Sequence, residues 1–208
     1  AQKTIKIASI NIPMTLMHSN TNYFFDLVEF YQDIDILGIC EMYLKNTIQL
    51  EIPPGYDFWS NGKGNDITTA FLTKKHLKRN ISFSEPFVNC SAIKVNLGQK
   101  KSEYVILMEL YRSPGEMSDR FINNGIIMSR EKYKLKLRDL ISTPSKKLIL
   151  MGDFNYDLNS ISDRKFRNRE ERFLTDLLRD SPFSNVTEGY KTHWSKIHNT
   201  TTSTDMVL

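Results

Sequence analysis

The chain has 208 residues, of which 40% are hydrophobic and 25% are charged, and its formal net charge is +4. This composition is ordinary for a globular protein, and domains typically run about 100–200 residues. It excludes a disordered tail, a collagen-like fibre and a small disulfide scaffold, and no apolar run approaches the roughly 18 residues of a transmembrane helix. We therefore expect one domain over residues 1–208.

Short apolar or alternating segments predict strands along the chain. Residues 4–10 alternate, and residues 35–40 form a short apolar run that is typical of a strand buried on both faces. Turn sequences such as Pro53-Pro54-Gly55 separate several of the segments. The further predicted strands are residues 68–72, 91–95, 104–111 and 147–151.

Three segments between these strands predict helices. Residues 24–31 and 169–179 each place apolar side chains at helical spacing on one side. Residues 116–141 are rich in charge, and we expect one long helix there that ends before Pro144. Strands interspersed with helices predict an α/β domain of layered sheets with helices outside.

Polar side chains stand where predicted strands end. Glu41 follows residues 36–40, Asp153 follows residues 148–152, and Asp205 lies in the last strand-like run; Asn11 and Asn155 stand at two more ends. Groups at the carboxyl ends of strands converge on one edge of a sheet. Such oxygen ligands suit Mg²⁺, which commonly takes one or two carboxylates together with water and a substrate phosphate.

Two segments concentrate positive charge. Residues 129–147 hold seven Lys or Arg against two acids, and residues 164–172 hold five against two. Basic stripes attract phosphate backbones, although a solvated helix face carries the same pattern. Cys40 and Cys90 are far apart in apolar segments, so we expect buried thiols rather than a zinc site.

Five motifs in chain order resemble those of the endonuclease/exonuclease/phosphatase superfamily. They are Ser9-Ile10-Asn11, the acid segment at residues 35–41, Leu110-Tyr111-Arg112-Ser113-Pro114, the GDFN motif at Gly152-Asp153-Phe154-Asn155, and Thr192-His193-Trp194 followed by Ser203-Thr204-Asp205. The resemblance implies a DNase I-like, four-layer sandwich of two β-sheets flanked by helices. In detail the chain resembles the endonuclease domain of non-LTR, LINE-like retrotransposons near the CR1 type, on its E-x-x-L segment at 41–44 and its Y-R-x-P-G run at 111–115.

The resemblance also implies roles for individual residues. Glu41 would hold the catalytic Mg²⁺, or Mn²⁺ in its place, with Asn11 beside it. Asp153 would activate the attacking water, and Asp205 would help to align the site. Asn155 and Tyr111 would contact the phosphate. The residues expected to contact DNA are Arg112, Arg164, Lys165, Arg167 and Thr192.

The implied function is nicking of double-stranded DNA, whose 3′-hydroxyl primes a downstream reverse transcriptase domain in the same polyprotein. We expect a nuclear or cytoplasmic protein without membrane contact. Relatives carry a Ser-Asp-His segment beyond the counterpart of Asp205, whereas this chain stops three residues after it. We therefore expect a domain that lacks its last strand or strands and nicks DNA weakly.

Two alternatives stay open from the sequence. One is another phosphodiesterase or repair nuclease of the same superfamily, against which the Y-R-x-P-G run argues. The other is an inactive remnant that only binds DNA, which the missing segment keeps open. Target preference would depend on loop shape and on a β-hairpin that enters a groove, for which residues 191–202 are the candidate.

Overall fold

The computed structural model describes residues 4–12, 23–45, 50–62, 67–86, 88–98, 100, 102–112, 120–123, 126–142, 147–155, 169–181, 183, 193–195, 200–202 and 205–207. Their elements, in chain order, are β1 (Ile7–Asn11), α2 (Tyr23–Phe30), β2 (Ile36–Cys40), β3 (Tyr56–Ser60), β4 (Ala70–Lys74), the 3-10 helix η1 (Lys75–Asn80), β5 (Ile81–Ser84), β6 (Cys90–Asn96), β7 (Tyr104–Tyr111), β8 (Arg120–Asn123), β9 (Ile126–Ser129), α3 (Arg130–Ser142), β10 (Leu148–Asp153), α4 (Arg169–Arg179), β11 (His193–Ser195), β12 (Thr200–Thr202) and β13 (Asp205–Val207).

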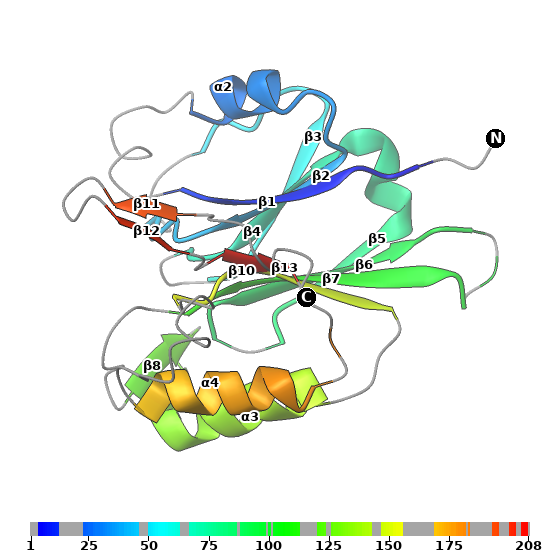
Figure 1. Ribbon diagram of the computed structural model, residues 1–208. Coiled ribbons are helices and arrows are strands. Elements are labelled where there is room, and N and C mark those ends of the chain that lie inside the picture. Colours follow the sequence, from blue (N-terminus) through cyan, green and yellow to red (C-terminus); the bar gives the residue numbers. More distant parts are fainter. Residues whose placement is uncertain are drawn as a thin grey trace.

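Two mixed sheets face each other at the centre of the domain. One has the strand order β1-β2-β4-β3, and the other has the order β13-β10-β7-β6-β5. Strands β1 and β2 run parallel, as do β7 and β10. Figure 1 shows α2 on the outer face of the first sheet and α3 with α4 on the outer face of the second. The predicted four-layer sandwich is confirmed.

The apolar runs in the central strands follow from this layering, because each strand is covered on both faces. In β2, Leu37 packs on the side of α2, whereas Ile36 packs between the two sheets. In β10, Leu150 packs against α3 and α4, whereas Met151 packs between the sheets. Three separate apolar clusters therefore fill the three spaces between four layers.

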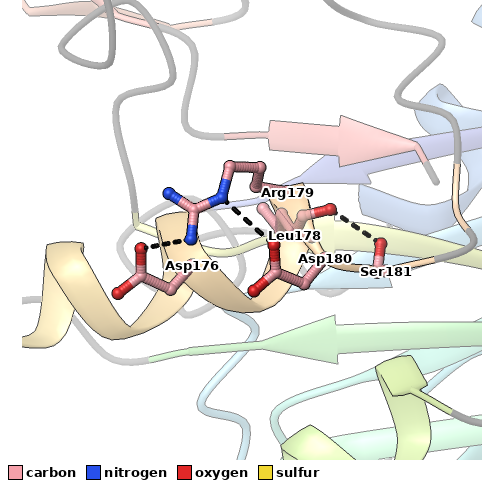
Figure 2. A network of polar contacts seen from close by, with 5 residues as sticks. All are labelled: Asp176, Leu178, Arg179, Asp180 and Ser181. Carbon is pink, nitrogen blue, oxygen red and sulfur yellow. Dashed lines mark hydrogen bonds and ion pairs between the residues drawn. The ribbon is translucent and has the colours of Figure 1, made fainter.

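The helices are held by one apolar stripe each. In α3, Tyr133, Leu137 and Ile141 recur every fourth residue and are all buried. Figure 2 shows the end of α4, where Arg179 bridges Asp176 and Asp180, with both N···O distances at 3.1 Å. Just beyond, the Ser181 hydroxyl donates to a carbonyl of the last turn, which satisfies an acceptor that the helix leaves open.

The expected helix over residues 116–141 is wrong at residues 120–123 and 126–129, and its first residues, 116–119, lie outside the described residues. The structure has an antiparallel hairpin there, β8 with β9, and α3 begins only at Arg130. The sequence signal was present, because Asn124-Gly125 separates two short apolar runs, and Asn-Gly is the strongest short hairpin signal. Strands β3 and β5 were not predicted, whereas β7 and α4 have the predicted bounds.

Candidate active site

Three strands bring polar side chains to one edge of the sandwich. Asn11 is the last residue of β1, Tyr111 the last of β7 and Asp153 the last of β10. Asp153 pairs with Tyr111 in the parallel ladder of the second sheet. Asn11 belongs to the other sheet, yet its Nδ2 donates to Asp153 Oδ2 at 2.8 Å. Of the strand-end residues predicted to converge, Asn11 and Asp153 therefore lie in contact, and this hydrogen bond joins the two sheets there.

The Asp153 carboxylate is held in a fixed orientation. Only 3% of the residue is exposed. The backbone N–H of Asn155 donates to Asp153 Oδ1 at 2.7 Å, and the Asn155 side chain donates to Asp153 Oδ2 at 3.2 Å. Together with Asn11, these donors leave the carboxylate little freedom, which suits a group that accepts a proton at a defined place.

The backbone around Asp153 explains two residues of its motif. Gly152 has φ of 123°, and a Cβ there would lie 2.0 Å from the Leu110 carbonyl oxygen on the neighbouring strand, so only glycine fits. Asn155 has φ of 48°, in the left-handed region that asparagine tolerates better than most residues. The loop after β10 is therefore tightly constrained.

Arg112 closes this loop from the adjacent strand. Its backbone N–H donates to the Asp153 carbonyl at 2.9 Å, and its Nη1 donates to the carbonyls of Phe154 at 3.1 Å and Asn155 at 3.4 Å. In return, Asn155 Nδ2 donates to the Arg112 carbonyl at 2.6 Å. Arg112 is only 5% exposed. Its contact with DNA stays a prediction, and sequence reasoning missed this internal role.

Glu41 directly follows β2 in a strained turn. Glu41 has φ of 63° and Tyr43 has φ of 43°, conformations that cost energy for residues of this kind. Tertiary contacts hold the turn, since the N–H of Met42 donates to the Thr68 carbonyl and Leu44 pairs with Ile67. Strain of this sort clusters at functional sites.

The donor set fits a hard divalent cation. Asn11 uses its amide nitrogen on Asp153, and among the described residues its buried Oδ1 has no hydrogen-bond partner. Glu41 stands one residue beyond Cys40, which pairs with Asn11 in the first sheet. No group of three or more His, Cys, Asp or Glu that could hold a metal occurs within the described ranges. A carboxylate and an amide oxygen, completed by water, match how proteins hold Mg²⁺.

Tyr111 is buried beside this corner and packs edge-to-face on Tyr43, with ring centroids 5.4 Å apart. Burial raises its pKa above the ordinary value, and a hydrogen bond with Tyr43 and the charges of Glu41 and Asp153 raise the pKa further. The hydroxyl therefore stays protonated and able to donate. Tyr43 was not predicted as a site residue; its position two residues after Glu41 was the only sequence signal.

The remaining predicted residues divide into two groups. Strand β13 pairs antiparallel with β10, which places Asp205 opposite Asp153 in the ladder. The expected hairpin is present, as β11 paired with β12. Arg164, Lys165, Arg167 and Thr192 lie outside the described residues.

A buried polar contact between the two sheets lies next to the site. The Ser9 hydroxyl of β1 donates to Glu109 Oε1 of β7 at 2.7 Å, and Glu109 is fully buried between the sheets. Gly38 makes room for it, because a Cβ there would lie 2.0 Å from Glu109 Oε2. Cys40 and Cys90 are buried thiols, as expected. Burial raises the pKa of Cys90, and the charge of Glu109 raises it further.

Comparisons with known proteins agree with this geometry. The model of the endonuclease/exonuclease/phosphatase family matches residues 9–206. The chain is similar in fold to the endonuclease domain of TRAS1, a telomere-specific non-LTR retrotransposon, with a TM-score of 0.64, 13% identity, and coverage of 98% of this chain and 84% of that one. It is also similar to the AP endonuclease LMAP from Leishmania major, with a TM-score of 0.66, 11% identity, and coverage of 97% and 77%. An AP endonuclease from Archaeoglobus fulgidus gives a TM-score of 0.58 at 16% identity, with coverage of 98% and 86%. No curated protein matches the sequence.

Proposed function

Because this chain belongs to the endonuclease/exonuclease/phosphatase family, we propose that it is a metal-dependent endonuclease domain that nicks double-stranded DNA for a retroelement. The nicked strand would prime a downstream reverse transcriptase domain of the same polyprotein. The Y-R-x-P-G run and the fold likeness to the TRAS1 endonuclease domain support the retroelement assignment. The protein would work in the nucleus or cytoplasm. Separately, none of the described helices is long and apolar enough to cross a membrane.

The observation that carries the proposal is the contact of Asn11 with Asp153 across the two sheets. It places a fixed carboxylate beside an amide oxygen that no described residue uses. Phosphodiester hydrolysis needs an activated water, a cation and fixed donors around the phosphate. Candidates for all three requirements lie at the edge of the sandwich where β1, β7 and β10 end.

Asp153 would accept the proton of the attacking water, since the hydrogen bonds from its neighbours fix the orientation of its side chain. Glu41 and Asn11 would hold Mg²⁺ or Mn²⁺, which when bound neutralises the charge that develops on the phosphate. Tyr111, whose hydroxyl stays protonated, would donate a hydrogen bond to a phosphate oxygen. Asp205, opposite Asp153 in the ladder, would help to align the site.

Asn155 has a dual task in this scheme. Its side-chain amide carries two hydrogens, which here serve the Arg112 carbonyl and Asp153 Oδ2. Contact with the scissile phosphate therefore requires the amide to release one of these acceptors. The longer of the two contacts, the one to Asp153 at 3.2 Å, is the one we expect to exchange.

DNA binding would depend on the basic segment that follows the GDFN motif. Replacing Arg164, Lys165 and Arg167 with Gln should weaken binding to any duplex and lower the slope of log affinity against log salt by up to about 0.9 per lost contact. The matched control replaces Lys132, Lys136 and Arg138, which are exposed on α3, with Gln and so removes the same number of charges. Equal effects of both sets would reject a specific role for residues 164–167.

The proposed function is tested by nicking of supercoiled plasmid with Mg²⁺ or Mn²⁺. We expect metal-dependent nicks that Asp153→Ala abolishes, whereas Asp33→Ala, whose side chain is 85% exposed, behaves as wild type. A second plasmid carries abasic sites, because two of the similar structures are AP endonucleases. Cleavage confined to that plasmid would favour a repair nuclease, and DNA binding without nicking of either plasmid would favour an inactive DNA-binding domain.

A further inference from the structure

We propose that Arg112 is a positioning residue, which acts on DNA cleavage by holding the loop at residues 153–155 rather than by contacting DNA. The inference rests on the proposed function for its effect on cleavage. It rests on the contacts of Arg112 alone for its effect on the loop.

The first argument is where the loop leaves the sheet. The N–H of Arg112 donates to the Asp153 carbonyl and so adds one bond beyond the last ladder pair of β7 and β10. The next two carbonyls, of Phe154 and Asn155, lie past the end of β10. Nη1 of Arg112 donates to both of them. One guanidinium nitrogen thus donates hydrogen bonds to the two backbone carbonyls that no longer take part in the ladder of β7 and β10.

The second argument is the conformation of Asn155. Its φ of 48° is one that a non-glycine residue keeps only where its surroundings fix it. Arg112 fixes it from two sides, because Nη1 binds its carbonyl and the Arg112 carbonyl binds its side chain. The two bonds from Asn155 to Asp153 depend on that conformation. Arg112 therefore determines how the carboxylate of Asp153 is oriented.

The third argument is burial. Arg112 is 5% exposed, and a buried cation needs polar partners to compensate for lost hydration. The guanidinium finds carbonyl oxygens, and it would have to leave them to reach a phosphate backbone. Lysine has a single compact ammonium on a flexible stem, so it keeps the charge without the planar, forked donor geometry. A Lys substitution therefore separates the two roles.

The experiment compares wild type with Arg112→Met, Arg112→Lys and the control Arg79→Met, whose arginine is exposed on η1. The nicking rate is measured in single turnover at saturating protein, and DNA affinity is measured against salt with EDTA present. Amide hydrogen exchange is followed at residues 153–155. Circular dichroism confirms folding of each variant, and Arg112→Gln, which keeps two amide donors, replaces any variant that does not fold.

We expect both Met and Lys variants to lower the saturated nicking rate by roughly 100-fold, the loss typical of a small misplacement of reacting groups. DNA affinity and its salt slope should match wild type, and exchange at residues 153–155 should accelerate. Arg79→Met should change none of these quantities.

The opposite pattern would overturn the inference. A direct DNA contact predicts weaker binding and a salt slope reduced by about 0.9 in Arg112→Met, with recovery in Arg112→Lys and unchanged exchange. Absence of nicking by wild type on any plasmid would reject the proposed function instead. Hydrogen exchange would then still decide whether Arg112 holds the loop.

Discussion

The polar groups at the two ends of strand β2 differ in whether they are satisfied by hydrogen bonds. Where β2 begins, Asp35 accepts a hydrogen bond from the Lys6 N–H at 3.0 Å and pairs with Lys74 at 3.2 Å. Where β2 ends, Glu41 has φ of 63°, and across the ladder from Cys40 the buried Oδ1 of Asn11 finds no partner among the described residues.

This difference separates stability from function along a single strand. Paired polar groups at the start of β2 stabilise the sandwich, because burial of a polar group costs free energy unless it is bonded. Strained and unsatisfied groups at the other end persist although they cost stability, which is typical of sites that bind ligands. We therefore expect substitutions at the two ends to have opposite profiles in activity and in stability.

The largest effect should come from Glu41→Ala. Loss of the carboxylate should abolish Mn²⁺ binding in calorimetry and lower the plasmid nicking rate by at least about 100-fold, since a bound cation supplies several kcal/mol at the transition state. The matched control is Glu85→Ala, at a residue of similar charge just after β5. Unchanged Mn²⁺ binding in Glu41→Ala would move the metal site elsewhere.

At the opposite end, Asp35→Asn should leave the nicking rate unchanged and lower the free energy of unfolding by about 1–2 kcal/mol, as expected for hydrogen bonds to a charged group near the surface. Burial raises the pKa of Asp35, but the Lys6 N–H and Lys74 outweigh burial and hold the pKa below its ordinary value. The stabilisation should therefore be complete above about pH 4 and lost as pH falls through the folded pKa.

Urea unfolding at several pH values measures this difference. The stability gap between wild type and Asp35→Asn should narrow in acid, and a gap that is constant with pH would contradict a role for the carboxylate charge. A lower nicking rate in Asp35→Asn would contradict the prediction that the start of β2 serves stability and not cleavage.

A smaller effect is expected from Tyr43→Phe, which keeps the ring contact with Tyr111 and removes the hydroxyl. The hydrogen bond with Tyr43 is one cause of the raised pKa of Tyr111, after burial. Its loss should lower that pKa only in part and slow nicking by up to about 10-fold, the value of one hydrogen bond. Ultraviolet titration and nicking rates measure the two effects, and a rate equal to wild type would leave Tyr43 with a packing role.

The sequence predicted the fold and the strand ends better than the contacts between them. The order of five motifs was enough for the four-layer sandwich, and the position of Asn11 and Asp153 at the carboxyl ends of predicted strands was enough to place them at one edge. The hairpin of β8 and β9 was missed because the charged segment at residues 130–139 predicted a helix, and that helix was extended toward the N-terminus as far as residue 116. That prediction did not use the hairpin signal of Asn124-Gly125.

Two site features could not be predicted because they depend on tertiary contact. Arg112 follows Tyr111 in the motif and carries a positive charge, so DNA was the natural partner to predict. Its side chain instead donates hydrogen bonds to the carbonyls of Phe154 and Asn155, which follow another strand and lie far along the chain. Tyr43 gains its place only through the left-handed turn after Glu41. No period of hydrophobic residues encodes either arrangement.

The smallest effect is also the sharpest test of the difference between the two ends of β2, because substitutions of Glu41 change both metal binding and backbone strain. Glu41→Gly removes the same carboxylate as Glu41→Ala, so both variants should lose Mn²⁺ binding. Glycine adopts φ of 63° without steric cost, whereas alanine keeps the strain of a side chain in the left-handed region. After allowing for the greater freedom of glycine in the unfolded chain, Glu41→Gly should unfold with about 0.5–1 kcal/mol more free energy than Glu41→Ala. Equal stability of the two variants in urea would mean that the turn after β2 relaxes without the glutamate, and that this end of the strand carries no strain for function.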